Sequence, residues 1–460
     1  MRQLILYLFL ILGGFQNSFS QTKSFGNQYF SLKSGIWHKV DIDGKHYKID
    51  TEIITIKFRT NDIHNFLRMH NLSVVRKSNN DYYDIRLPKN SSVLEFSEAI
   101  LTEFSIVESV DINSYGEYGF TPNDSQFSNQ WYLTKIGMPS AWDMVQGNNS
   151  IQIAIIDTGL DIAHEDIGRG IDTYDNLWQN VGEDPWTNPN NPASGNGIDD
   201  DGNSLIDDWR GWDFVNLNND VRSPGNFHGT HVSGIVSAKL HNGIGISGIG
   251  GGNNNNGLQL MMIGVGETTP SSAALDDAIL YAVQMGADVI QLSLSVAQTT
   301  AIDNAIQTAI NNGIPVICAS GNQNSSVAYP ANNPNVISVG ATNQSDQKAS
   351  FSNFGQYLFI SAPGVQIRST QLGNTYNNAD GTSFAAPQVS AVVGLIRSIN
   401  PSLTVQQISD LLRSTADKVG GVNYNWNPNN PGHSQELGFG RVNGCRAVLQ
   451  AYNTGNSIVG

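Results

Sequence analysis

Five short apolar runs, separated by helical patterns, constrain the fold of the chain most strongly. The runs occupy residues 151–156, 258–263, 287–294, 314–319 and 335–340, and helical patterns occupy 228–240, 272–286, 300–312, 383–399 and 404–415. Near-continuous apolar strands that alternate with helices are typical of a parallel sheet covered on both faces. We therefore expect an α/β fold with a doubly wound, mostly parallel sheet, and function at the carboxyl ends of its strands.

The chain before residue 119 has a different pattern. Residues 52–111 are predicted to form a strand, a helix, two strands, a helix and a last strand, which is the ferredoxin-like order. Residues 113–130 are polar and rich in turn residues, as in a linker. The sequence thus predicts a small α+β domain followed by a larger α/β domain.

The first twenty residues have the pattern of a secretory signal peptide. Arg2 precedes an apolar run of about ten residues, and small residues follow at Ser18 and Ser20. No later segment has the roughly 18 uninterrupted apolar residues that span a membrane. We expect cleavage after Ser20 and a secreted protein. Cys318 and Cys445 are not expected to pair, because Cys318 lies in the apolar run "IPVICA" of a core strand.

Charge is distributed unevenly along the chain. Residues 21–118 carry 12 Lys and Arg against 13 Asp and Glu, whereas residues 119–460 carry 12 against 27, a difference of −15. A strongly acidic protein repels nucleic acid and anionic membranes, so neither is an expected partner. The acidity suits an exported monomer that collects divalent cations.

Polar residues with catalytic chemistry follow or begin several of these elements. Asp157 ends the first apolar run, Asn322 follows the fourth, and His228 and Ser383 each open a helix. Taken singly, each has an ordinary explanation, since Asp and Asn stabilise turns and Ser caps helices. His228 and His231 also have the spacing of a metal pair, although the zinc-protease pattern with an intervening Glu is absent. Together, an acid, a base and a nucleophile at strand ends and helix starts indicate covalent catalysis by Ser.

The text around these residues resembles the subtilisin-like serine protease (subtilase) family over about residues 127–450. The stretches "IAIIDTGLD", "HGTHVSGIV" and "GTSFAAPQVSAVVGLI" resemble its catalytic signatures, and "ASGNQNS", "YPANNPNVISVGAT", "ASFSNFG" and "APGV" resemble further landmarks. The resemblance implies that Ser383 is the nucleophile, His228 the general base and Asp157 the residue that orients the base. It also implies that the Asn322 amide and the Ser383 N–H hold the oxyanion.

The same resemblance implies the domains and partners. Residues 1–20 are the expected signal peptide, 21–118 an inhibitory propeptide with its ferredoxin-like core at 52–111, and 119–460 a subtilisin-like catalytic domain. Protein or peptide substrates are the implied partners. The protein's own propeptide is the implied intramolecular inhibitor.

The substrate groove is also assigned by resemblance. The segments that line the family's groove and first specificity pocket match Ser293, Leu294 and Ser295, and Ala319, Ser320 and Gly321, with Ala328 at the pocket base. Ser295 and Ala328 stand where the family commonly has Gly, and Ala328 is expected to narrow the pocket. No acidic residue occurs in 292–296 or 319–330, so we expect apolar side chains, not Arg or Lys, to bind there.

Two segments suggest calcium sites. The stretch "LHNGIGI" resembles the family's high-affinity calcium loop, and the implied ligands are the side chains of Asp166 and Asn242 and the carbonyls of Leu240, Ile244 and Ile246. The family's N-terminal Gln ligand has no match at Phe127, although Gln126 is close to that position.

The second segment is an insert at about 177–208, in the long interval between Asp157 and His228. Its residues Asp199, Asp201, Asn203 and Asp208 fit ligand positions of an EF-hand-type loop. Gly197 occupies the first position and does not fit, and an acidic surface turn explains the pattern equally well.

Two other functions are compatible with parts of this pattern. One is a catalytically silent peptide-binding protein on the same fold, which is disfavoured because no triad or oxyanion position is substituted. The other is a metal-dependent hydrolase that uses His228 and His231. We expect a secreted serine endopeptidase that is processed from a pro-form by its own activity and stabilised by calcium.

Overall fold

The computed structural model describes most of the chain. The described residues are 22–25, 28–33, 36–40, 46–60, 63–78, 81–88, 91–114, 120–168, 175–253, 255–428 and 430–456. The chain divides into two compact units, residues 1–118 and 119–460. The predicted signal peptide lies outside the described residues.

The first unit is an antiparallel sheet with two helices. Its elements are β1 (Thr22–Phe25), β2 (Gln28–Lys33), β3 (Ile36–Val40), β4 (His46–Phe58), α1 (His64–Met69), β5 (Ser73–Lys77), β6 (Tyr82–Arg86), α2 (Val93–Glu103) and β7 (Val107–Ser114). Four strands lie in the order β7-β4-β6-β5, which is the ferredoxin-like arrangement expected from the sequence. The long strand β4 begins at His46 and also pairs with β3, so the sheet extends beyond the predicted core.

The second unit contains a seven-stranded parallel sheet. Its strands are β8 (Gln152–Asp157), β9 (Gly211–Asp213), β10 (Gln259–Gly264), β11 (Val289–Leu292), β12 (Val316–Ala319), β13 (Ile337–Thr342) and β14 (Ile360–Pro363). They lie in the order β14-β13-β12-β11-β8-β10-β9, and every neighbouring pair is parallel. The expected doubly wound sheet is therefore present, with β8 near its centre.

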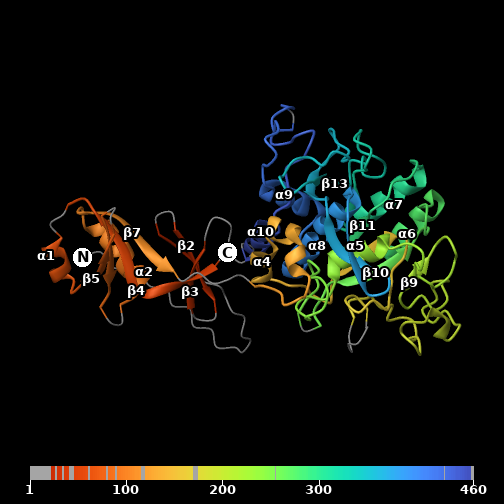
Figure 1. Ribbon diagram of the computed structural model, residues 1–460, viewed down its shortest axis with the longest axis horizontal. Coiled ribbons are helices and arrows are strands. Elements are labelled where there is room, and N and C mark those ends of the chain that lie inside the picture. The colour runs from red at the N-terminus through yellow and green to blue at the C-terminus, as the bar shows by residue number, and fades with distance from the viewer. Residues whose placement is uncertain are drawn as a thin grey trace. The chain divides into compact units, whose positions relative to one another are not determined.

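Helices cover both faces of this sheet. They are α3 (Trp131–Lys135), α4 (Met138–Trp142), α5 (His228–Ser237), α6 (Ser272–Gln284), α7 (Thr300–Asn311), α8 (Thr382–Ile399), α9 (Val405–Thr415) and α10 (Gly444–Asn456). Successive side chains of a strand face opposite sides. Thus Ile153 and Ile155 of β8 join a core with α5, α8 and α10, whereas Ala154 and Ile156 join a core with α6 and α7. Figure 1 shows α6 and α7 on the right of this sheet and α8 and α10 on its left.

Some strands were not predicted because their sequences lack an apolar pattern. The three-residue strand β9 exists because it pairs with β10, and the hairpin of β15 (Ile367–Gln371) and β16 (Thr375–Ala379) contains the polar segment "TYNNA". Cys318 and Cys445 are both buried and form no disulfide bond with each other. Among the described residues, no helix has the length and apolar character that a membrane crossing requires.

Candidate active site

The expected triad residues lie at the carboxyl edge of the sheet. Asp157 is the last residue of β8, His228 the first residue of α5, and Ser383 the second residue of α8, a helix that packs against α5. Gly229 allows α5 to begin close to the loop after β8. A Cβ atom at Gly229 would lie 2.1 Å from the carbonyl oxygen of Gly159, so no larger residue fits there.

His228 and Asp157 form a direct hydrogen bond. Nδ1 of His228 lies 2.7 Å from Oδ1 of Asp157, and the Asp157 side chain is 2% exposed against 25% for His228. Burial alone would lower the pKa of His228. The charge of Asp157 and the hydrogen bond to it together outweigh burial, so the pKa of His228 is raised above its ordinary value. This contact favours the tautomer with the proton on Nδ1, which leaves Nε2 able to accept another proton.

His231 does not pair with His228 around a metal. Its Nε2 lies 3.1 Å from the Ile367 carbonyl oxygen, to which it donates, and its ring centroid is 4.5 Å from that of Phe384. Burial, the largest influence, lowers the pKa of His231 to about 3, so the ring is neutral. In the described part of the chain, the one group of three or more His, Cys, Asp or Glu side chains placed to share an ion contains neither histidine.

Ser383 lies inside the first turn of α8 and does not cap it. Gly381 is the N-cap, so the Ser383 N–H is one of the free N–H groups of the helix start. Pro387 has no N–H, and this leaves the Ser383 carbonyl without its helical donor. Ser293 Oγ donates to that carbonyl at 2.7 Å, and the Ser383 hydroxyl donates to the Ser293 carbonyl at 3.3 Å. Ser293 therefore holds Ser383 through both its backbone and its side chain.

Asn322 follows β12 and is oriented by Thr382. The N–H and the hydroxyl of Thr382 both donate to Asn322 Oδ1 at 2.9 Å, and the Thr382 hydroxyl accepts the Gly321 N–H at 3.1 Å. Because its oxygen is used in this way, the exposed Asn322 side chain is left with its NH₂ group as a donor. Thr382 is missing from the predicted site residues, although its position directly before Ser383 could have indicated it.

The predicted pocket residues belong to two segments that follow or end the neighbouring strands β11 and β12. Leu294, Ser295, Gly321 and Ala328 are exposed or half-buried, and Ser293, Ala319 and Ser320 are buried. The Ala328 N–H donates to the Ser320 carbonyl at 2.9 Å, which brings the predicted pocket base against the second segment. The buried residues thus belong to the core on which the site rests, and the exposed and half-buried residues remain accessible to a ligand.

The predicted calcium loop encloses two carboxylates. Asp166 is fully buried, and its oxygens accept the Asn242 side-chain amide at 2.9 Å and the Ile246 N–H at 2.8 Å. Asp124, which is 5% exposed, accepts backbone N–H groups of residues 241–243. Burial raises the pKa of both carboxyls, and the charge of Asp124 adds to the rise at Asp166. Leu240 and Ile244 lie in the same loop.

Asp124 was missed by the sequence reasoning, which considered Gln126. The structure shows that Gln126 Oε1 accepts two hydrogen bonds from the Arg368 guanidinium, at 2.8 and 2.6 Å. The fully buried Lys239 brings one positive charge near Asp166, so two carboxylates and one ammonium leave one negative charge unbalanced. An oxygen-rich, net negative pocket of this kind fits a hard cation such as calcium.

The insert gathers some of its predicted ligands and not others. Asp201 and Asp208 form a group with Glu183 in which an oxygen of each lies within 4.8 Å of the others. Asn203 adjoins the group, since its Nδ2 donates to both aspartates at 3.1 Å. Asp199 lies outside it, because its two oxygens accept N–H groups of the following turn. Glu183 was missed because it lies 18 residues before Asp201, outside any EF-hand register.

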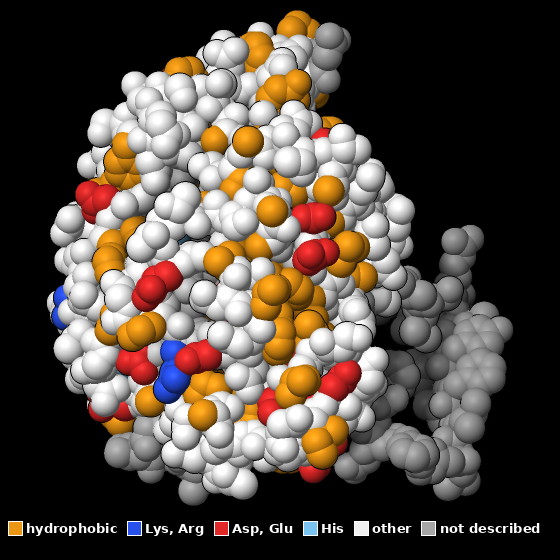
Figure 2. Space-filling view, turned by 90° about the vertical axis from the view of Figure 1, so that its right-hand side faces the viewer, with side chains coloured by type: hydrophobic (Ala, Val, Ile, Leu, Met, Phe, Trp, Pro, Cys, Tyr) orange, Lys and Arg blue, Asp and Glu red, His pale blue; other side chains and the backbone are white. Residues whose placement is uncertain are grey.

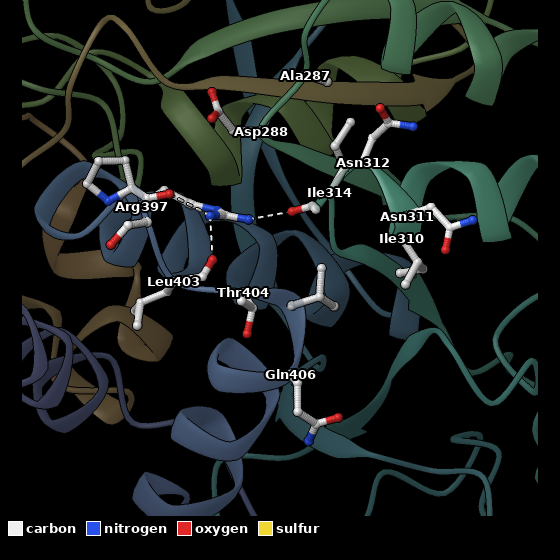
Figure 3. Close-up of a pocket in the computed structure, with 14 residues that line it drawn as sticks. Ala287, Asp288, Ile310, Asn311, Asn312, Ile314, Arg397, Leu403, Thr404 and Gln406 are labelled. Atoms are coloured by element: carbon white, nitrogen blue, oxygen red, sulfur yellow. Dashed lines mark hydrogen bonds between the residues drawn. The ribbon is translucent and has the colours of Figure 1, made fainter.

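A cavity of about 630 Å³ lies apart from these residues, between the end of α7 and the start of α9. Arg397 extends across it, as Figure 3 shows. Its guanidinium donates to the carbonyl oxygens of Pro401 and Leu403 and of Gly313 on the opposite side. Through these contacts of its two terminal nitrogens, Arg397 joins the two chain segments.

The fold and this group of residues define a class of protein. A parallel sheet with an Asp–His pair at its carboxyl edge, next to a helix with Ser in its first turn, has the parts of a serine hydrolase. Comparison with known proteins then gives the family, because residues 148–440 match the subtilase family. The chain belongs to this family and is a serine-type endopeptidase.

Relatives of known activity agree with this assignment. The chain is 34% identical over 347 residues to a thermophilic serine proteinase of Bacillus sp. (strain AK1), which covers 75% of this chain and 73% of that protein. It is 34% identical over 333 residues to thermitase of Thermoactinomyces vulgaris, covering 72% and 99%. A solved protease structure from Pseudoalteromonas arctica superposes with a TM-score of 0.55 at 27% identity, covering 72% of this chain and all of that one.

Proposed function

We propose that this subtilase cleaves peptide bonds with an Asp157–His228–Ser383 triad, through an acyl-enzyme intermediate. The observation that carries the proposal is the 2.7 Å contact between His228 and Asp157 at the sheet edge, next to the helix that begins at Thr382. Asn322 completes the site with a side-chain donor. The alternative of a silent peptide-binding protein has no substituted position to support it.

The chemistry follows from the placement of these groups. On substrate binding, the Ser383 hydroxyl turns from the Ser293 carbonyl toward Nε2 of His228. His228 takes its proton as Ser383 Oγ bonds to the scissile carbonyl carbon, and Asp157 stabilises the imidazolium. The proton then passes to the leaving amine, the C–N bond breaks, and an ester on Ser383 remains. Water, deprotonated by His228, hydrolyses that ester and restores the Ser383 hydroxyl.

A covalent inhibitor directed at activated serine tests this mechanism against its rivals. We expect one equivalent of inhibitor to add to the peptide that contains Ser383 and to stop hydrolysis, as detected by mass spectrometry. A zinc chelator should leave peptide hydrolysis intact. Loss of activity with the zinc chelator, and no labelling of Ser383, would favour the metal-dependent alternative.

The oxyanion role of Asn322 is testable by substitution. Removing one preorganised donor from such a site lowers kcat by about 10²- to 10³-fold. Asn322→Ala should therefore reduce kcat by this amount with little change in KM, in steady-state assays on a peptide substrate. Thr382→Ser is the matched control, because it keeps the hydroxyl and the N–H that orient Asn322. Equal losses of kcat and of substrate affinity in Asn322→Ala would contradict the role.

The first specificity pocket is proposed to accept apolar side chains. The support is the absence of acidic residues in 292–296 and 319–330, together with the Val296 N–H, which donates to the Tyr329 carbonyl at 3.1 Å and joins the two walls. In a peptide library, we expect substrates with Leu or Phe before the scissile bond to be cleaved at least tenfold faster than those with Lys or Arg. A preference for basic residues would contradict the proposal.

The protein is further proposed to be secreted and to be made as a pro-form. The leader pattern at 1–20 and the separate ferredoxin-like unit before residue 119 support this. A relative named extracellular protease, from Xanthomonas campestris, is 32% identical over 377 residues. Residues 21–118 would act as an intramolecular inhibitor until the enzyme cleaves the segment that follows them.

Calcium is proposed to stabilise the second unit. Asp124, Asp166 and Asn242 would hold the ion, which would supply a charge that balances the buried carboxylates and would take no part in the chemistry. An ion that binds only the folded state adds RT ln(1 + [L]/Kd), about 3 kcal/mol at a hundredfold excess over Kd.

The calcium proposal predicts a change in thermal stability. In the full-length Ser383→Ala protein, which avoids self-digestion, millimolar calcium should raise the Tm relative to chelator. Asp166→Asn should remove most of this increase, whereas Asp277→Asn, an exposed carboxylate of α6, should retain it. Identical melting curves of the parent with calcium and with chelator would contradict the proposal.

A further inference from the structure

The insert between β8 and α5 carries many carboxylates and no compensating cation of its own. Residues 177–208 contain seven Asp and Glu and no Lys or Arg. The next basic residue, Arg210, is already paired with Asp175 through two hydrogen bonds, at 3.1 and 2.8 Å. Figure 2 views the side of the second unit that carries β9 and the insert, and acidic side chains are more frequent there than basic ones. The insert thus has no basic residue of its own to balance its negative charge.

Three of these carboxylates converge on one point. Glu183, Asp201 and Asp208 each place an oxygen within 4.8 Å of the others. Asp208 is fully buried and Glu183 is 4% exposed. Oε2 of Glu183 is buried and has no hydrogen-bond partner among the described residues. A buried carboxylate oxygen without a donor, next to two further carboxylates, is unfavourable unless a cation is present.

The neighbouring hydrogen bonds supply no positive charge. The Tyr281 hydroxyl donates to Asp208 at 2.6 Å, and the amide of Asn180 donates to both Asp201 and Asp208, at 2.8 and 2.7 Å. These donors are neutral. Burial raises the pKa of Glu183 and of Asp208, and the charge of Asp201 adds to both increases. A divalent cation at this point would offset both burial and repulsion.

We infer that the insert binds one calcium ion through Glu183, Asp201 and Asp208. The group offers only hard oxygen ligands and no thiol or imidazole, which selects calcium or magnesium over the softer transition metals. Calcium is favoured over magnesium because ligands from separate loop segments tolerate its irregular coordination better. A cavity of about 380 Å³, lined in part by Asn180, Asp201 and Asn203, borders the group at Asp201.

This site is independent of the proposed catalytic roles and of the pocket around Asp166. Binding there would join the start of the insert, at Glu183, to its end, at Asp208. The same two parts also meet through the rings of Trp186 and Trp209, whose centroids are 5.5 Å apart. The ion would therefore reinforce a junction that the two tryptophan rings already make.

The experiment uses the full-length Ser383→Ala protein, calcium chloride, and two readouts. Equilibrium dialysis counts bound ions, and tryptophan fluorescence reports on the insert, because four of the eight tryptophans lie between residues 178 and 212. Calcium should give a saturable change in emission. Glu183→Gln should lower the number of bound ions by one. It should also raise the calcium concentration at the midpoint of the emission change at least tenfold. Asp201→Asn, at an exposed position, should do the same and covers the case in which Glu183→Gln does not fold.

A matched control and a second variant make the result specific. Asp184→Asn changes the charge of an exposed neighbour outside the group and should leave both readouts unchanged. Asp166→Asn should remove a different ion and keep the tryptophan response, which separates this site from the other calcium proposal. An ion count that is the same in the parent, Glu183→Gln and Asp201→Asn would overturn the inference. Binding of magnesium with equal affinity would overturn the assignment to calcium.

Discussion

Ser383→Ala is expected to reduce peptide hydrolysis by about 10⁴- to 10⁶-fold in kcat, the loss that follows removal of a triad nucleophile. The covalent intermediate cannot form without Ser383 Oγ, and the remaining groups act only by binding and polarising the substrate. The fold should persist, because Ala favours a helix and the Ser293 hydroxyl bonds to the Ser383 backbone carbonyl. Steady-state hydrolysis, circular dichroism and thermal melting provide the measurements.

The control for this variant is Ser398→Ala on the same helix. Ser398 Oγ donates to the Gly394 carbonyl at 2.9 Å, and the change should leave turnover unaffected. A folded Ser383→Ala protein that retained appreciable turnover would refute the mechanism.

The same variant tests maturation. If the enzyme processes itself, the active protein should be cleaved within about residues 113–120, and the Ser383→Ala protein should keep residues 21–118 attached. Mass spectrometry of both proteins, made in a host without other proteases, distinguishes the two forms. Residues 21–118 added separately should inhibit the mature enzyme. Normal maturation of the Ser383→Ala protein would contradict self-processing.

Asp157→Asn is expected to lower kcat by about 10⁴-fold. An amide in place of the carboxylate can present an N–H to Nδ1 of His228, which then favours the tautomer in which Nε2 carries the proton and cannot accept another. It also removes the charge that raises the pKa of His228. The substitution is nearly isosteric, so the sheet should remain intact.

The pH dependence gives an independent readout. His228 must be neutral to take the proton of Ser383, so the activity of the parent should fall as the pH drops through the raised pKa of His228. Without the Asp157 charge, burial is the main remaining influence and lowers that pKa, so the acidic limb of kcat/KM should move to lower pH in Asp157→Asn. Asp161→Asn, which removes a nearby carboxylate, is the control. A small loss of activity in Asp157→Asn, with the acidic limb of its kcat/KM profile at the same pH as in the parent, would contradict the role assigned to Asp157.

Much of the secondary structure of the second unit could be predicted, because it depends on short stretches of the sequence. Five of the seven strands of the parallel sheet overlap the predicted apolar runs, and the helices have amphipathic patterns, so the type of these elements can be inferred from a few neighbouring residues. Asp157 and Asn322 could be located for the same reason, since they follow apolar runs at the functional edge of the sheet. The strands β9 and β16 could not be predicted in this way. They are strands because they pair with β10 and β15, and their own residues show no strand pattern.

The sequence by itself determined the fold class and the family, and it led to the proposed order of acid, base and nucleophile, because each of these inferences depends on short contiguous stretches. The tertiary structure alone decided which polar groups meet. His231 is neutral because it is buried, and its ring donates to the Ile367 carbonyl. Ser383 is held by Ser293. The two carboxylate groups proposed to bind calcium each include a residue that no local pattern indicated, Asp124 in one and Glu183 in the other. These contacts join residues that are far apart in the chain. A hydrogen bond or a shared charge depends on distance in space, and no local pattern of residue types records that distance.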